Sequence, residues 1–180
     1  MINRRVEGQQ GSGRRRLFWE HEGIIQLNEL QERHEVFEQA RAYADSRSKP
    51  LLVVGTPKHE FSHSFGDVTI DTDLNKLGQG NTEIADVRAI PYPDGYFGAA
   101  FCSHVLEHLP TIEDAFKALD EMERVADSVF TVSPHKISLI ANIYPGHNLW
   151  ITPSGDGYII EQRKQGTPRK ESYVISMQVI

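Results

Sequence analysis

The sequence feature that most constrains the fold is a series of short apolar runs that alternate with helical or turn-forming sequence. The runs span residues 51–55, 67–71, 96–102 and 128–132, with a weaker one at 83–86. Short, continuous apolar runs are typical of strands that are buried on both faces of a parallel sheet. Because helical sequence separates some of these runs, the pattern predicts an α/β architecture.

Two segments have the periodicity of amphipathic helices. Residues 27–45 carry apolar side chains at helical spacing, and Asn28 can cap the start of this helix. Residues 112–126 form the clearest helix, because Thr111 stands three residues before Asp114 in a pattern close to a capping box. We expect both helices to pack on the predicted sheet, which gives three layers.

The connections between the early strands are short, and the chain ends in hairpin-like sequence. Only residues 56–67 and 72–81 separate the first three strands, whereas a parallel crossover needs about a dozen residues or more. The segments 149–152, 158–162 and 173–179 can pair as antiparallel strands. We therefore predict a three-layer, Rossmann-like α/β fold with a mostly parallel sheet, an antiparallel C-terminal end and trimmed early crossover helices.

Length and composition suit one folded domain of 180 residues. Residues 1–16 are rich in Gly, Gln and Arg and predict a flexible basic tail, so residues 17–180 form the domain. The net charge of −6 argues against a nucleic-acid partner, and no apolar run approaches the ~20 residues that span a bilayer. The single cysteine, Cys102, excludes an internal disulfide, and we expect a cytoplasmic protein.

Three residues stand where successive predicted strands end. Gly55 ends the first strand, so its backbone can approach a ligand without an intervening side chain. Asp71 ends the second strand, where a carboxylate can accept both hydroxyl hydrogens of a ribose. Asp86 ends the third and can accept a hydrogen bond from an exocyclic amine such as that of adenine. Since ligands bind outside the carboxyl ends of such strands, the three residues predict a crevice for a nucleoside.

The segment 86–109 resembles the central part of class I S-adenosylmethionine-dependent methyltransferases of the type-11-like group. In that family an acidic residue, a Leu-Pro-Phe-Pro-Asp run and a further strand lead into His-Val-Leu-Glu-His. Here residues 90–94 read Ile-Pro-Tyr-Pro-Asp, and the full run from His104 to His108 is present. The resemblance covers roughly residues 51–134, and its middle segment is the specific part.

The resemblance implies S-adenosylmethionine as cofactor and methyl transfer to an acceptor, which we expect to be a small molecule. Asp71 then binds the ribose, and Asp86 lies near the adenine with Val87 beside the ring. Ser103 and His104 lie beside the methionine part. The implied cofactor-binding residues are Gly55, Thr56, Asp71, Asp86, Val87, Ser103 and His104.

The first loop departs from the family pattern. The family has a Gly-x-Gly-x-Gly run there, whereas this chain has Gly55-Thr56-Pro57 with a single glycine. Pro57 also removes a backbone donor. The loop and the short crossovers favour a second interpretation, in which the chain is a methyltransferase-like domain that has lost catalysis and serves as a binding or scaffold protein.

Catalysis by this family would depend mainly on alignment of donor and acceptor, because a sulfonium is already an activated methyl donor. A hydroxyl or amine acceptor would benefit from a base, and imidazole titrates near neutrality. The candidate bases are His104, His108, His135 and His147. The loop 143–148, together with Trp150, is expected to contact the acceptor. The sequence alone ranks none of these histidines as catalytic.

A third interpretation is a zinc hydrolase, since His104, Glu107 and His108 also form the pattern H-x-x-E-H. Zinc would need both imidazoles on one helical face. His104, however, directly follows a predicted strand, and Pro110 would end any helix that begins there. We therefore assign no metal ligand from the sequence.

Overall fold

A computed structural model describes residues 11–57, 63–154, 157–163 and 175–177. Its helices are α1 (Gly11–Ser46), η1 (Leu74–Lys76), η2 (Leu106–His108), α2 (Ile112–Val125) and α3 (Leu139–Ile143), where η denotes a 3₁₀ turn. Its strands are β1 (Leu51–Val54), β2 (Val68–Asp71), β3 (Thr82–Ile84), β4 (Ala99–Ser103), β5 (Val129–Val132), β6 (Leu149–Ser154), β7 (Gly157–Gln162) and β8 (Ile175–Met177).

The strands form two sheets. The larger sheet has the order β3-β2-β1-β4-β5 and is parallel throughout. The smaller sheet, β6-β7-β8, is antiparallel. The chain runs outward from β1 to β3 and then returns to the other side of β1 with β4, so the strand order reverses between β1 and β4. The predicted Rossmann-like α/β fold with an antiparallel C-terminal end is confirmed.

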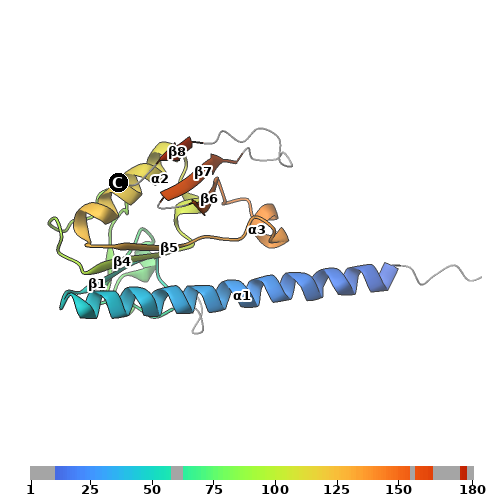
Figure 1. The fold of residues 1–180 in the computed structure, drawn as a ribbon, viewed down its shortest axis with the longest axis horizontal. Coiled ribbons are helices and arrows are strands. Elements are labelled where there is room, and N and C mark those ends of the chain that lie inside the picture. The colour runs from blue at the N-terminus through green and yellow to red at the C-terminus, as the bar shows by residue number, and fades with distance from the viewer. Residues whose placement is uncertain (1–10, 58–62, 155–156, 164–174, 178–180) are drawn as a thin grey trace, which may run out of the picture.

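Helices cover the two faces of the parallel sheet, with α1 on one side and α2 on the other (Figure 1). Side chains alternate between the faces along each strand. Leu51 and Val53 of β1 therefore pack with Phe37 of α1. Leu52 and Val54 point to the opposite face, into the larger core beneath α2.

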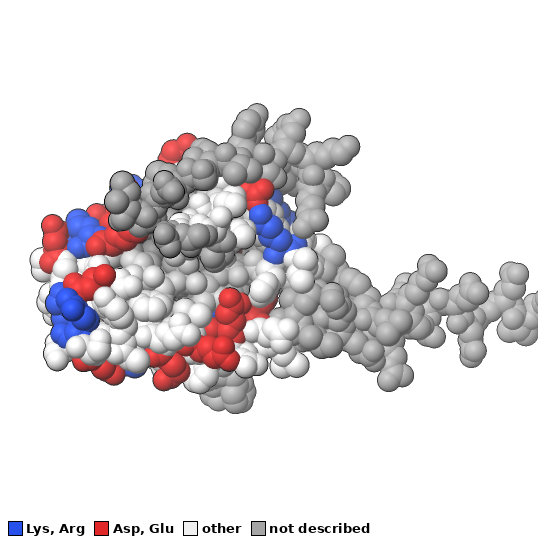
Figure 2. Space-filling view, viewed as in Figure 1, with Lys and Arg blue, Asp and Glu red and all other residues white. Residues whose placement is uncertain are grey.

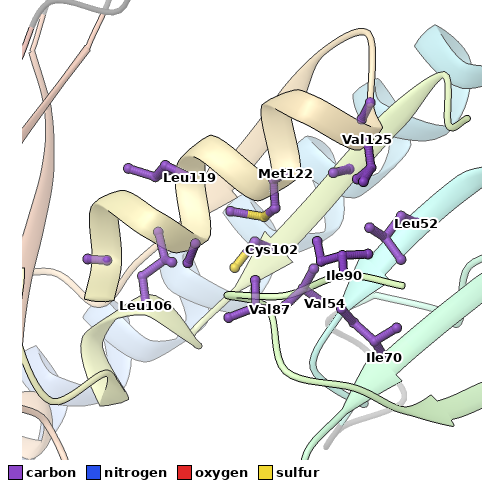
Figure 3. Packing of buried hydrophobic residues seen from close by; sticks show 14 of the residues in the cluster. Leu52, Val54, Ile70, Val87, Ile90, Cys102, Leu106, Leu119, Met122 and Val125 are labelled. Carbon is purple, nitrogen blue, oxygen red and sulfur yellow. The ribbon is translucent and has the colours of Figure 1, made fainter. Parts of the chain in front are cut away.

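Helix α2 is built from the local signals that predicted it. The Thr111 hydroxyl caps the helix by accepting a hydrogen bond from the backbone N–H of Asp114 at 3.1 Å. The helix then buries one stripe, and Figure 3 shows Leu119, Met122 and Val125 of that stripe packed over the sheet. Full burial of such a side chain contributes about 1.5–3 kcal/mol, so this interface is a main source of stability.

The early crossovers are trimmed, as predicted. Between β2 and β3 the chain makes only the short turn η1, and the described residues between β1 and β2 contain no helix. Two strand boundaries differ from the prediction. β3 ends at Ile84, so Asp86 lies two residues beyond the strand. β4 begins at Ala99, because Phe97 forms only an isolated bridge with Ala126 before the regular ladder starts.

Helix α1 begins at Gly11, within the segment predicted as a tail, and its first part extends beyond the sheet (Figure 1). The prediction rested on the lack of apolar residues to bury. Arginine has a high intrinsic helix propensity, and Arg14, Arg15 and Arg16 lie in the part of that segment that is helical. Residues 1–10 lie outside the described residues. None of the helices among the described residues is long and apolar enough to span a membrane.

Charged side chains are mixed over the face drawn in Figure 2. Acidic groups and a few basic groups lie among uncharged residues there, and the described residues visible in this view form no continuous basic surface. The expectation that nucleic acid is not a partner remains a prediction from net charge.

Candidate functional site

The ends of β1 and β2 meet at one edge of the sheet. The backbone N–H of Gly55 donates to Ile70 at 2.8 Å, which continues the ladder past β1. Asp71 then accepts hydrogen bonds on Oδ2 from the backbone and the hydroxyl of Thr56, at 2.9 and 2.8 Å. Its Oδ1 accepts from the backbone of Asp73 at 3.0 Å. The structure thus brings Gly55, Thr56 and Asp71 together.

These hydrogen bonds decide the charge of Asp71. Partial burial would raise its pKa, but the backbone donors of Asp73 and Thr56 and the Thr56 hydroxyl together hold the pKa of Asp71 below its usual value. The carboxylate is therefore ionised at neutral pH. Because each carboxylate oxygen can accept two hydrogen bonds, Oδ1 keeps capacity for a ligand hydroxyl beside the Asp73 contact.

Gly55 is required for a reason that the sequence did not reveal. Its φ of +85° is in the left-handed region that favours glycine. A Cβ at this position would lie 2.6 Å from Cγ2 of Val105. The side of Gly55 that we expected to be open to a ligand is therefore filled by Val105 from the loop after β4.

Asp86 lies at the same edge but is paired within the chain. Nη2 of Arg88 lies 2.6 Å from Oδ2 of Asp86, and Nη1 of Arg88 lies 2.7 Å from Asp114 at the start of α2. These hydrogen bonds from Arg88 hold the pKa of Asp86 below its usual value. Val87 is only 5% exposed and packs in the core (Figure 3). Its side chain is therefore not open to a ligand.

The end of β4 carries a contact that sequence reasoning missed. Nη2 of Arg33, from α1, lies 2.6 Å from Nδ1 of His104. A guanidinium can only donate, so Nδ1 of His104 is the acceptor and the neutral ring carries its proton on Nε2. Burial first, and then the charge of Arg33, lower the pKa of His104 to about 2. His104 is therefore neutral at physiological pH.

Several polar atoms around this contact are buried without a hydrogen-bond partner among the described residues. They include Nε of Arg33, Oγ of Ser103 and Nε2 of His104. Ser103 is 7% exposed, and His104 has a φ of +54°, a strained conformation for a residue other than glycine. Buried donors are normally satisfied, so three such donors at one sheet edge indicate a place for a ligand that accepts hydrogen bonds.

His63 lies on the α1 side of the sheet beside this group. Its ring packs edge-on to Phe101, with 5.1 Å between ring centroids, and lies near Phe37. Burial, followed by the charge of Arg33, lowers the pKa of His63 to about 4. His63 is therefore a neutral, buried ring at physiological pH, and sequence reasoning did not single it out.

The local signal for Arg33 was present but was interpreted incorrectly. The helical periodicity of residues 27–45 predicted an inward stripe through Leu30, His34, Phe37, Arg41 and Ala44, with Ala40 beside it. Phe37, Ala40 and Ala44 are buried as predicted, whereas His34 is exposed and the partly buried Arg33 lies one turn before Phe37. An arginine one turn before a buried phenylalanine was the signal that could have indicated a charged side chain at the sheet edge.

The H-x-x-E-H hypothesis is wrong in its geometry. His104 precedes η2 with a left-handed backbone, so His104 and His108 do not share a helical face. Nδ1 of His104 accepts a hydrogen bond from the guanidinium of Arg33, so that nitrogen is not available to a metal ion. Glu107 lies 3.5 Å from that same nitrogen. A zinc hydrolase built on His104, Glu107 and His108 is therefore not supported.

The remaining candidate bases lie in two places. His135 is exposed, and its Nε2 lies 3.1 Å from Glu32 of α1. His108 and His147 pack against each other, with 4.9 Å between ring centroids, and both contact the ring of Tyr144. Residues 144–148 therefore lie beside η2. Trp150 follows in β6, where the guanidinium of Arg163 lies over its ring at 5.7 Å.

A family model described as a methyltransferase domain matches residues 66–128. This segment contains Asp71, Asp86, Val87, Ser103 and His104, and it excludes the loop after β1 and helix α1. The comparison with curated proteins finds no match. The resemblance predicted from the sequence is confirmed for the matched segment.

Proposed function

We propose that this chain binds S-adenosylmethionine at the carboxyl edge of its parallel sheet, since residues 66–128 match a family model described as a methyltransferase domain. We further propose that it transfers the methyl group to a small-molecule acceptor. The cofactor lies across the reversal point between β1 and β4, the usual ligand position in open α/β sheets.

One observation carries the proposal, namely the three donors around the end of β4. Arg33 supplies a positive charge, while Ser103 Oγ and His104 Nε2 are buried donors without a partner among the described residues. A carboxylate is the group that satisfies a cation and two neutral donors at once. The methionine part of S-adenosylmethionine ends in such a carboxylate, and we place it there.

The nucleoside part then extends toward β2 and β3. Asp71, already ionised and fixed by Thr56, accepts a hydrogen bond from a ribose hydroxyl. Asp86 lies farther along the same edge and accepts from the adenine amine beside its contact with Arg88. The backbone of Val87 lines the adenine position. The rigid hydrogen bonds at Asp71 and Asp86 reduce the conformational entropy that binding would otherwise cost.

The sulfonium of the bound cofactor supplies an activated methyl group. The residues of this chain bind and orient it, and alignment alone can lower the barrier by about 7–11 kcal/mol. His104 is not the base, since its pKa of about 2 leaves it a poor proton acceptor at neutral pH. Its role is to donate from Nε2, while Arg33 holds the ring in that tautomer.

Isothermal titration calorimetry with two ligands tests this assignment. S-adenosylhomocysteine retains the carboxylate, whereas 5′-methylthioadenosine lacks it. A charge-assisted hydrogen bond contributes about 1.5–3 kcal/mol, so we expect S-adenosylhomocysteine to bind roughly 10–100-fold more tightly. Arg33→Met should remove most of this preference. Arg47→Met is the matched control, because Arg47 pairs with Asp127 on the surface and should leave the preference unchanged.

The scaffold interpretation is the second candidate, and the first loop favours it. Val105 fills the face of Gly55, and Thr56 and Asp73 already occupy part of the Asp71 carboxylate. In a domain that no longer binds a cofactor, we expect the chain's own side chains and backbone to occupy the former binding groups in this way. If neither S-adenosylmethionine nor S-adenosylhomocysteine binds at millimolar concentration, the enzyme proposal is wrong and the scaffold becomes the better account.

A further inference from the structure

A second group of side chains lies next to the proposed cofactor edge and has a different chemistry. Glu107, His108 and His147 each offer one ligand atom, and the three atoms lie within 4.8 Å of one another. Glu107 is 1% exposed and His147 is 8% exposed. Two imidazoles and one carboxylate form a ligand set that proteins use for zinc and other first-row divalent metals.

The orientation of the two histidines fits metal binding. Nδ1 of His108 lies 2.9 Å from the carbonyl oxygen of Gly146, and Nδ1 of His147 lies 3.1 Å from that of Ala141. A carbonyl oxygen can only accept, so each Nδ1 carries a proton and each neutral ring has its lone pair on Nε2. Metal-binding histidines are commonly oriented in this way, with the second nitrogen donating to a backbone carbonyl.

The backbone holds the two ligand-bearing segments together. The N–H of Asn148 donates to the carbonyl of Glu107 at 2.7 Å, and the Asn148 side chain donates to the carbonyl of His108 at 3.0 Å. Gly146 packs closely at this junction, because a Cβ there would lie 2.8 Å from Cε1 of Tyr144 and 3.4 Å from Nδ1 of His108, so that a larger residue would shift the Tyr144 ring. The ligands from η2 and from the loop before β6 are therefore fixed relative to each other.

We propose that Glu107, His108 and His147 form a binding site for a divalent transition metal, with Zn²⁺ as the ion of choice. Three protein ligands leave a fourth position for water or for an acceptor oxygen, as in catalytic rather than structural zinc sites. A cation there also places positive charge beside the buried carboxylate of Glu107. This site shares Glu107 and His108 with the H-x-x-E-H interpretation, and His147 takes the place of His104 as a ligand.

The test uses purified full-length protein that has been stripped with a chelator and titrated with ZnCl₂ alone, followed by calorimetry and metal analysis. We expect one Zn²⁺ per chain. His108→Gln and His147→Gln should each weaken binding at least tenfold, since each removes one ligand. His34→Gln is the control, because His34 is an exposed histidine of α1, and it should bind Zn²⁺ like the unmodified chain.

The visible absorption of bound Co²⁺ gives a second measurement, which reports the coordination geometry of the metal. The unmodified chain should show the visible absorption of tetrahedral Co²⁺, and this band should be lost in His147→Gln. Circular dichroism of the metal-free variants separates ligand loss from unfolding. Binding well below one Zn²⁺ per chain, or equal binding by the His34, His108 and His147 variants, would overturn the proposal. Neither experiment uses S-adenosylmethionine, so failure of the metal site would leave the proposed methyltransferase function unaffected.

Discussion

Gly55→Ala should be strongly destabilising, for two reasons that can be separated. The first is backbone strain, since a φ of +85° costs a residue with a Cβ about 1–2 kcal/mol. The second is overpacking, since the new Cβ would lie 2.6 Å from Cγ2 of Val105, and such crowding costs about 1–3 kcal/mol. The expected loss in the free energy of unfolding is therefore roughly 2–5 kcal/mol.

A double-mutant cycle separates the two contributions. In a Val105→Ala background the crowding methyl is absent, so Gly55→Ala should cost only the strain, about 1–2 kcal/mol. Urea denaturation of the four proteins, followed by circular dichroism, gives each free energy of unfolding. Equal costs in the two backgrounds would show that Val105 does not fill the face of Gly55. A cost below about 0.5 kcal/mol in both would refute the strained conformation as well.

Three further results are expected from the described contacts. The pKa of His63 is about 4 in the fold and 6.5 in the unfolded chain, so the unfolded state binds the proton more tightly and stability falls as pH drops from 6.5 toward 4. His63→Phe should remove this loss, at most about 3 kcal/mol by urea denaturation at pH 7 and pH 4.5. Thr111→Ala should lower the free energy of unfolding by about 1 kcal/mol through loss of the α2 cap, as measured by urea denaturation. Cys102 should resist Ellman's reagent at pH 8 until the chain unfolds, because burial and then the charge of Glu107 raise the pKa of its thiol.

Each of these results has a clear opposite. An unchanged pH dependence in His63→Phe would assign the acid sensitivity to other groups near Arg33, such as His104. No change on Thr111→Ala would mean that the cap hydrogen bond is replaced by water at no cost. Rapid modification of native Cys102 would contradict its place in the core (Figure 3).

Local signals predicted most of the fold. The apolar runs located β1, β2 and β5, and the cap and apolar stripe of α2 gave its start and its end to within one residue. The boundaries of β3 and β4 were less accurate. Tyr96 and Phe97 were predicted to start β4, but Phe97 forms only an isolated bridge with Ala126 and its ring packs against that of Tyr96. The early start of α1 was missed because residues 11–16 carry no apolar periodicity from which a helix could be predicted.

Contacts between distant segments account for what the sequence did not reveal at the site. Arg33 and His104 are 71 positions apart, and no local pattern joins them. Val105 reaches Gly55 only because β1 and β4 are neighbours. The sequence correctly placed Asp71 and Asp86 at one edge, but their partners depend on Thr56 and Arg88 in the folded chain.

A crystal structure with S-adenosylhomocysteine tests the central proposal most directly. The account predicts that the ligand carboxylate lies within hydrogen-bond distance of Arg33, of Oγ of Ser103 and of Nε2 of His104, with a ribose hydroxyl on Asp71. A bound ligand whose carboxylate points away from the end of β4, toward solvent or toward β3, would contradict it.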